Sequence, residues 1–358
     1  MIPHGEPLMR SRSIEQPVDV SILIVSYNAG SDLEQILAVL CEIPEQQRRE
    51  TIVVDNASQV DTQTVLDRYA GQIRLIRNRV NRGFASAVNQ AFEASSGRYL
   101  LLLNPDTVIH RDVLDRLVEY LDQNPSTGAV APSLIYPDGR IQPSRGSFPN
   151  LLRTAAAVFG VKRWMPRDEW IHRRAGRWLG HLFRQYSAPC SVEIVDYTTG
   201  ACVLIRRSVF ERLGGLDERF FLYYEEIDLA LRMRHAGDTW VFLGDLKVMH
   251  SVAAASGQAP LRPYYERARS LMLFYRKHKP AWQCLVVYLM LAGRSLLQLI
   301  SLALCGRFRI DPTKKKAEEK ATIASIFGLL RLLFRSDQNQ SGSRSEDQIG
   351  RASCRERV

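Results

Sequence analysis

Short apolar runs alternate with amphipathic helical patterns through the first third of this chain. The runs are rich in β-branched residues or leucine, as buried strands are, and they lie at residues 20–25, 51–54, 73–76 and 99–103. Between and after them, apolar residues recur at helical spacing, at 33–40, 84–94 and 113–121. This alternation predicts an α/β fold with a Rossmann-like, mostly parallel central sheet flanked by helices.

The composition predicts a globular chain with an anionic partner. Of its 358 residues, 46% are hydrophobic and 24% are charged, which excludes wholesale disorder. The formal net charge of +10 favours nucleotide phosphates, lipid diphosphates, acidic headgroups or nucleic acid as partners. No recognisable nucleic-acid module accompanies the basic residues, so we expect no nucleic-acid binding.

The cysteines and the N-terminal region indicate where the protein works. Six cysteines lie far apart, with no Cys-x-x-Cys pair and no zinc-like spacing. Most fall within apolar runs, which predicts buried, reduced thiols in the cytoplasm. No apolar stretch precedes Val18, so we expect no secretory signal and a reaction on the cytosolic side.

Polar residues stand where the predicted strands end. Ser26-Tyr27-Asn28 follows the first run, Asp55-Asn56 the second, and Asn104-Pro105-Asp106 the run at 99–103. In a doubly wound sheet, ligands bind beyond the carboxyl ends of the strands. These residues therefore become candidates for a ligand site, although Asn104 and Asp106 could also form only a turn, and Asp55 only a strand-end cap.

Further motifs follow in a fixed order along the chain. They are Arg82-Gly83 at the start of a helix that includes Asn89, Gly200 before an apolar run at 202–205, Glu225-Glu226-Ile227-Asp228 at another helix start, and His250. No G-x-G-x-x-G follows the first strand, and neither a P-loop nor a G-x-S-x-G motif occurs. Dinucleotide dehydrogenases, P-loop NTPases and common hydrolases are therefore disfavoured.

Together these motifs resemble the family-two inverting glycosyltransferases of GT-A fold, and more narrowly their rhamnosyltransferase-like branch. The resemblance covers residues 18–280 and rests on the order and spacing of the motifs. The broader family carries Asp-x-Asp where this chain has Asn104-Pro105-Asp106, a form associated with the rhamnosyltransferase-like branch.

The resemblance implies a nucleotide-sugar donor and a divalent cation, Mg²⁺ or Mn²⁺, that neutralises the leaving diphosphate. It implies that Asp106 binds the metal, that His250 binds the metal or contacts the diphosphate, and that Asp55 bonds the pyrimidine base. A structural role for His250 and a solvated Arg82 are the alternatives. The donor-binding residues are then expected to be Ser26, Asn28, Asp55, Asn56, Arg82, Gly83, Asn89, Asn104 and Gly200.

Inverting transfer needs one base to deprotonate the acceptor hydroxyl. The family places this carboxylate second in an acidic pair, which here is Glu225-Glu226, so the resemblance implies Glu226 as the base. Glu225 is the alternative, because the family usually has Glu-Asp. Asp228, on the same helical turn, is expected to orient the site. Without the other motifs, these acids would only complement a helix N-terminus.

The remaining segments suggest contact with a membrane. Basic residues interleave with tryptophan through 151–190, which suits either a solvated helical insertion or a surface facing anionic lipid. Residues 281–305 are nearly all apolar around Gly293-Arg294-Ser295, and two short helices are expected there in preference to one spanning helix. With the basic, amphipathic stretch up to 336, they predict a peripheral anchor at the cytosolic face of the plasma (inner) membrane.

The predicted organisation is therefore a loose leader, a catalytic domain, a membrane-associating helical segment and a polar tail. Their limits are 1–17, 18–280, 281–336 and 337–358, with a nucleotide-binding half at 18–130 and an acceptor half at 131–280. The tail is expected to be disordered and partly vector-derived.

The predicted function is transfer of L-rhamnose from dTDP-L-rhamnose to a saccharide acceptor linked to polyprenyl diphosphate, in cell-surface polysaccharide synthesis. The alternatives are transfer from a UDP-sugar and a homologue that binds a nucleotide sugar without turnover.

Overall fold

The computed structural model describes residues 18–42, 49–160, 191–251 and 262–305, which fall into two compact units. Unit 1 holds the described residues up to 148 together with 191–218 and 225–251, and unit 2 holds 149–160, 219–224 and 262–305. The predicted leader, the insertion beyond residue 160 and the segments after residue 305 lie outside the described residues.

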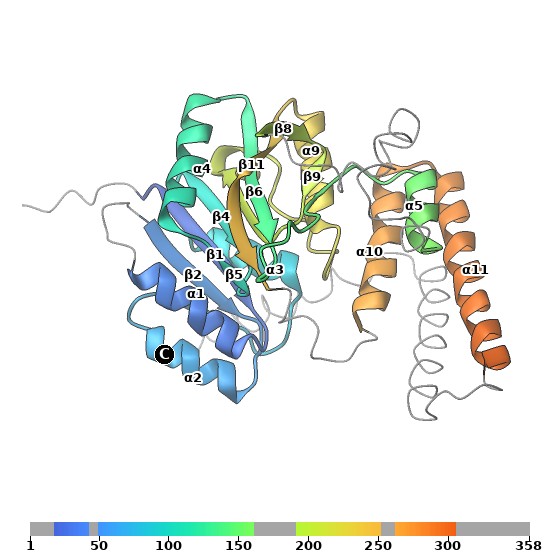
Figure 1. Cartoon of the computed structure of the whole chain (residues 1–358), viewed down its shortest axis with the longest axis horizontal. Helices are drawn as coiled ribbons and strands as arrows, with labels where there is room; N and C mark the ends of the chain where they lie inside the picture. The colour runs from blue at the N-terminus through green and yellow to red at the C-terminus, as the bar shows by residue number, and fades with distance from the viewer. Residues whose placement is uncertain (1–17, 43–48, 161–190, 252–261, 306–358) are drawn as a thin grey trace, which may run out of the picture. The chain divides into compact units, whose positions relative to one another are not determined.

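Unit 1 is built on one central sheet, in which nine described strands follow the order β3-β2-β1-β4-β10-β6-β11-β5, with β8 paired to β11 (Figure 1). The strands are β1 (Val20–Ser26), β2 (Arg49–Asp55), β3 (Arg74–Arg77), β4 (Tyr99–Leu103), β5 (Thr107–Val108), β6 (Thr127–Ile135), β8 (Val192–Val195), β10 (Cys202–Arg206) and β11 (Thr239–His250). Two further strands, β7 (Arg145–Gly146) and β9 (Tyr197–Thr198), pair with each other.

The strand directions agree with the predicted sheet in its first half and differ in its second. Strands β3, β2, β1 and β4 are parallel neighbours. Strand β10 is antiparallel to both β4 and β6, so these two point the same way, and β11 is parallel to β6. Strands β5 and β8 run against β11. The predicted α/β fold with a mostly parallel sheet is confirmed, with antiparallel strands added at and beyond β10.

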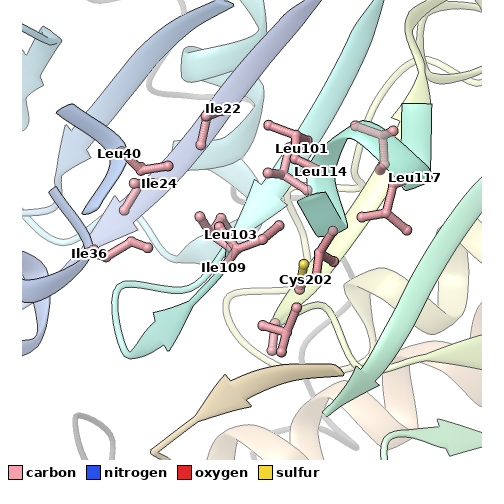
Figure 2. Packing of buried hydrophobic residues seen from close by; sticks show 14 of the residues in the cluster. Ile22, Ile24, Ile36, Leu40, Leu101, Leu103, Ile109, Leu114, Leu117 and Cys202 are labelled. Atoms are coloured by element: carbon pink, nitrogen blue, oxygen red, sulfur yellow. The ribbon is translucent and has the colours of Figure 1, made fainter. Parts of the chain in front are cut away.

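Helices cover both faces of this sheet. They are α1 (Gly30–Glu42), α2 (Val60–Tyr69), α3 (Phe84–Glu93), α4 (Arg111–Gln123), α8 (Arg207–Arg212) and α9 (Glu225–His235). Alternate residues of a strand point to opposite faces, and Figure 2 shows Ile22 and Ile24 of β1 and Leu101 and Leu103 of β4 in one cluster with side chains of α1 and α4. Helix α3 contacts β1 and β2, and its buried residues lie outside that cluster. Each fully buried leucine or isoleucine contributes about 2 kcal/mol to folding.

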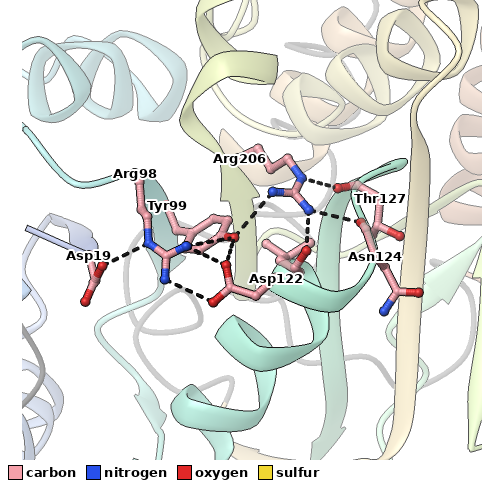
Figure 3. A network of polar contacts seen from close by, with 8 residues as sticks. Asp19, Arg98, Tyr99, Asp122, Asn124, Thr127 and Arg206 are labelled. Atoms are coloured by element: carbon pink, nitrogen blue, oxygen red, sulfur yellow. Dashed lines mark hydrogen bonds and ion pairs between the residues drawn. The ribbon is translucent and has the colours of Figure 1, made fainter.

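A network of arginines closes the edge of the sheet where β4 begins (Figure 3). Arg98 binds the Asp122 carboxylate through Nη2 at 3.0 Å, and this bond holds the pKa of Asp122 below its usual value. Arg206, at the end of β10, donates to carbonyl oxygens that close α4 and the turn after it, at Leu121, Asn124 and Thr127. A cation is favourable at the C-terminus of a helix, so Arg206 stabilises the end of α4.

Unit 2 is helical, with α5 (Leu151–Val158), α10 (Arg262–His278) and α11 (Ala281–Cys305). Helix α11 packs against both α5 and α10, and the hydroxyls of Thr154 and Tyr275 are 2.7 Å apart. The prediction of two short helices over 281–305 is wrong, because α11 continues through Gly293. One internal glycine costs only about 1 kcal/mol, and it leaves the helical hydrogen bonds in place. No helix among the described residues has the length and apolarity needed to cross a membrane.

Candidate functional site

The polar residues after β1, β2 and β4 meet at one edge of the sheet in unit 1. Ser26, the last residue of β1, lies opposite Asp55, the last residue of β2. On the other side of β1, Ile24 lies opposite Leu103, so Asn104 begins its turn beside the end of β1. Parallel pairing therefore brings three of the predicted motifs together, although Ser26 and Asn104 are 78 residues apart in the chain.

Asp55 is bonded within its own loop. Its carboxylate is 1% exposed and accepts hydrogen bonds from Ser58 N at 3.1 Å and from Gln63 Nε2 at 2.6 Å. Asn28, with φ of 54°, donates from its backbone to Ser58 Oγ at 2.9 Å. Among the described residues, the buried hydroxyl of Ser26 finds no hydrogen-bond partner. Asp55 thus caps the turn after β2, and its contact with a pyrimidine base stays a prediction.

Asn56 holds the loop that precedes α3. Its amide nitrogen donates to Asn81 Oδ1 at 3.0 Å and to the carbonyl of Gly83 at 3.1 Å. Its amide oxygen accepts from Asn78 Nδ2 at 3.1 Å and from the backbone of Arg82 at 3.0 Å. The Arg82 side chain is exposed, and Gly83 has φ of 87° at the N-cap of α3, a conformation that glycine adopts without strain. The Asn56 side chain therefore holds the loop at 78–83 in place through these four hydrogen bonds.

Asn89 and Asp228 act on another loop, at 213–218. Asn89 on α3 accepts from Leu216 N at 3.0 Å and donates to the Leu216 carbonyl at 2.8 Å. A Cβ added at Gly215, whose φ is 72°, would lie 2.7 Å from Asn89 Oδ1. Asp228 is fully buried and binds Arg232 Nε at 2.8 Å, and Arg232 Nη2 donates to the Gly215 carbonyl at 2.9 Å. Both predicted site residues are therefore engaged in supporting the segment that leads to α9.

The turn between β4 and β5 carries Asn104 and Asp106. The backbone of Asn104 donates to the Ala201 carbonyl at 2.9 Å, which ties this turn to the one before β10. Because β5 pairs with the end of β11, His250 lies opposite Thr107. The Asp106 carboxylate is consequently 3.2 Å from His250 Nε2, and both side chains are largely buried. The structure brings these two predicted metal ligands together from positions 144 residues apart in the chain.

The donor set around Asp106 fits a divalent cation that a diphosphate helps to hold. His250 Nδ1 is 2.9 Å from Gln142 Oε1, so a proton on Nδ1 would leave a lone pair on Nε2 facing Asp106. Burial, and then the charge of Asp106, raise the pKa of the nearby Asp32. No group of three or more His, Cys, Asp or Glu residues is arranged to hold a metal in the described part of the chain. Two protein ligands leave most of an octahedral shell for diphosphate oxygens and water.

The acidic pair at the start of α9 consists of two carboxyl groups in different surroundings. Glu225 is 6% exposed, and burial together with the neighbouring Glu226 raises its pKa well above the usual 4.5. Glu226 is less buried, and its Cβ would be 3.8 Å from a Cβ added at Gly200. The backbone enters α9 through Tyr223 and Tyr224, with φ of 69° and 71°. Such strain is concentrated at functional sites.

Three residues around these loops were not predicted from the sequence. Gln63 bonds Asp55, Gln142 bonds His250, and Asp32 lies within the electrostatic influence of Asp106. Gln142 follows a Pro-Asp-Gly turn, which is a hairpin signal, but nothing local indicates that the hairpin reaches His250.

The chain is similar in sequence to known glycosyltransferases. The model of a family described as Glycosyl transferase family 2 matches residues 21–214, more than half of the chain. The chain is 29% identical over 274 residues to the N-acetylglucosaminyl-diphospho-decaprenol L-rhamnosyltransferase of Mycobacterium tuberculosis H37Rv, with 73% of this chain and 85% of the relative covered. It is 26% identical over 228 residues to the rhamnosyltransferase WbbL of Escherichia coli K12, covering 61% of this chain and 78% of that protein.

Solved structures share the architecture at low sequence identity. The mannosyltransferase PcManGT from Pyrobaculum calidifontis, in complex with GDP-Man and Mn²⁺, has a TM-score of 0.51 at 16% identity over 89% of each chain. GalNAc-T7 with UDP, GalNAc and Mn²⁺ has a TM-score of 0.51 at 15% identity, covering 72% of this chain and 48% of that one. Likenesses at these identities show a common fold.

Proposed function

The chain belongs to glycosyl transferase family 2, has the GT-A fold and is a glycosyltransferase, and we propose that it transfers L-rhamnose from dTDP-L-rhamnose to a lipid-linked saccharide. The names of two relatives support this donor sugar, since both are rhamnosyltransferases. The name of the mycobacterial relative also supports the acceptor, a sugar carried on diphospho-decaprenol. Such a product serves the synthesis of cell-surface polysaccharide.

The convergence of two turns and one helix start is the observation that supports a transfer site. The turn at Asn104 is bonded to Ala201, the neighbouring Gly200 packs beside Glu226, and Asp106 pairs with His250. A donor diphosphate between Asp106 and the Asn104 turn would place its sugar toward Glu226. Inverting transfer requires a leaving-group site and a base on opposite sides of the anomeric carbon.

Asp106 and His250 are the residues that would hold the cation, and Asn104 contacts the donor phosphate or sugar. When bound, a divalent cation neutralises the charge that develops on the diphosphate as it leaves. Its remaining ligands would be diphosphate oxygens and water, because no group of three or more His, Cys, Asp or Glu residues in the described chain is arranged to hold a metal. Asn56 and Asn89 act on the site indirectly, through the loops that they hold.

Glu226 is assigned as the general base because it is the less buried acid of the pair and so the more accessible to an acceptor hydroxyl. In the step itself, the acceptor oxygen bonds to the anomeric carbon while the bond from that carbon to the diphosphate oxygen breaks. The hydroxyl proton passes to the Glu226 carboxylate, and the bonding pair leaves with the nucleoside diphosphate. The result is one displacement with inversion at the anomeric carbon. Asp228 holds Arg232 in place, and Arg232 binds the loop at 213–218 that leads to α9.

The donor is tested by offering the full chain dTDP-L-rhamnose or UDP-sugars, with an N-acetylglucosaminyl-diphosphate polyprenol acceptor and with Mg²⁺, Mn²⁺ or EDTA. We expect transfer from dTDP-L-rhamnose only, lost in EDTA, with a product of inverted anomeric configuration by NMR. Transfer from a UDP-sugar alone would overturn the donor assignment, and full activity in EDTA would overturn the metal assignment.

The base is tested by Glu226→Gln, which keeps the size of the side chain and removes its basicity. We expect kcat to fall by about 10²- to 10⁴-fold with donor binding retained. Glu211→Gln is the matched control, because Glu211 is exposed on α8 and its nearest cation, Arg207, is 3.4 Å away. Unchanged transfer by Glu226→Gln would refute the assignment of the base. A wild-type protein that binds donor and shows no transfer would indicate a homologue without turnover.

A lipid-linked acceptor requires contact with a bilayer, and we assign this contact to an exposed face of α11 in unit 2. Its buried face carries Val287, Leu291 and Ser295, while apolar side chains face outward over a helix about 37 Å long. The exposed apolar residues are Trp282, Leu285, Leu289, Leu296, Leu297 and Ile300. Apolar side chains that lie in an interface, together with a net charge of +10, favour anionic lipid.

Flotation with liposomes tests this surface. The wild-type chain should float with vesicles of anionic phosphatidylglycerol and much less with phosphatidylcholine. The double variant Leu285→Gln, Leu289→Gln should lose most of this binding, whereas Val80→Gln, at an exposed valine of unit 1, should not. Equal flotation of both variants would overturn the assignment to α11.

A further inference from the structure

Gln142 lies at the end of a hairpin that follows β6, and this hairpin places its side chain in contact with His250. Ile135 and Ile141 form an isolated bridge across the turn, and Gln142 N donates to the Leu134 carbonyl at 2.8 Å. Strand β6 also pairs with β11, so the end of β11 runs beside the base of this hairpin. The backbone on both sides of Gln142 and of His250 is therefore held in place before their side chains meet.

The contact between the two side chains determines which ring nitrogen of His250 carries its proton. A neutral imidazole has one N–H donor and one lone-pair acceptor. Gln142 Oε1 lies 2.9 Å from His250 Nδ1, and a carbonyl oxygen can only accept. With Oε1 toward the ring, the proton of a neutral His250 belongs on Nδ1, and Nε2 is the nitrogen that lies 3.2 Å from Asp106 Oδ1.

The opposite arrangement has a different chemical outcome. If the amide nitrogen of Gln142 faced Nδ1, the imidazole proton would move to Nε2 and bond Asp106. The ring would then have no lone pair for a cation on that side. The orientation with Oε1 toward the ring leaves two acceptors, Nε2 and the carboxylate, 3.2 Å apart, and both would then be available to hold a divalent cation.

We propose that Gln142 is a positioning residue that fixes His250 in the Nδ1–H tautomer, so that Nε2 and Asp106 together bind the divalent cation. This inference rests on the proposed function, since it assumes that His250 and Asp106 hold a metal. Partners of this kind on the far nitrogen of a ligating histidine typically account for 10- to 100-fold in metal affinity.

The test compares two variants of similar shape in the full chain. Gln142→Leu removes the acceptor, whereas Gln142→Glu keeps oxygens that accept from Nδ1–H. Binding of Mn²⁺ is measured from the free Mn²⁺ signal in electron paramagnetic resonance, with and without dTDP. We expect at least about a 10-fold loss of affinity for Gln142→Leu and wild-type or tighter affinity for Gln142→Glu. Equal affinities for wild type and Gln142→Leu, or equal losses in both variants, would overturn the proposal.

A second measurement uses the wild-type protein, so it does not depend on whether the variants at position 142 fold. In wild-type protein labelled with ¹⁵N-histidine and kept in EDTA, the ring nitrogens of His250 should show the Nδ1–H tautomer, with the signal assigned from its loss in His250→Asn. An Nε2–H tautomer would overturn the proposal. Asp106→Asn separates this result from failure of the metal site. If Asp106→Asn leaves Mn²⁺ affinity unchanged, the metal assignment fails. If Asp106→Asn lowers the affinity and Gln142→Leu leaves it unchanged, only the positioning role fails.

Discussion

Replacing Asn56 by alanine should destabilise the protein far more than a typical change of one amide side chain. The amide is 2% exposed and makes four hydrogen bonds, two as donor and two as acceptor, to the loop at 78–83. A hydrogen bond of this kind contributes about 1 kcal/mol net, and an unsatisfied buried partner costs about as much again. We expect the free energy of unfolding to fall by about 3–4 kcal/mol.

The measurement is urea denaturation followed by far-UV circular dichroism. Asn124→Ala is the matched control, because its amide makes a single bond, to the Tyr120 carbonyl at 2.8 Å, and should cost only about 1 kcal/mol. The steady-state KM for donor should rise with Asn56→Ala as well, since the loop before α3 loses its support. If Asn56→Ala is as stable as the control while KM alone rises, the residue serves the ligand directly and our reasoning is refuted.

Three further outcomes follow from the charges and thiols. Glu225→Gln should be about as stable as the wild type near pH 4 and more stable than it above pH 4.5. The reason is that a carboxyl whose pKa is raised in the folded state destabilises the wild-type protein as the pH rises above 4.5, and glutamine does not ionise. Parallel profiles of stability against pH in the two proteins would contradict this. Arg206→Met should lower the urea stability by about 2–3 kcal/mol by removing charge-assisted bonds to the carbonyls that close α4, and a change below about 0.5 kcal/mol would refute it. Burial raises the pKa of Cys202 to about 12, so iodoacetamide at pH 8 should label the exposed Cys41 and spare Cys202 until the protein is denatured, as read by peptide mapping.

Local patterns were enough to place β1 to β4, β10 and the helices α1, α3 and α4 of unit 1, whereas β6, β11 and α2 were not predicted. A run such as Tyr99–Leu103 is apolar at every position, and the structure buries every position of it. The helix at Phe84–Glu93 and the acidic start of α9 were likewise readable, because burial on one face and charge at a helix start are properties of neighbouring residues. The same reasoning went wrong for Cys41, which has apolar neighbours but lies on the exposed side of α1.

The sequence by itself therefore determined the α/β alternation, the strand ends and the order of the motifs. Only the tertiary structure decided that β10 runs antiparallel between β4 and β6, that 281–305 is one helix, and what each polar side chain bonds. His250 meets a glutamine 108 residues away, at a distance in sequence that no local pattern encodes. Hydrogen-bond partners are set by strand register and by loops closing on one another, and these exist only once the chain has folded.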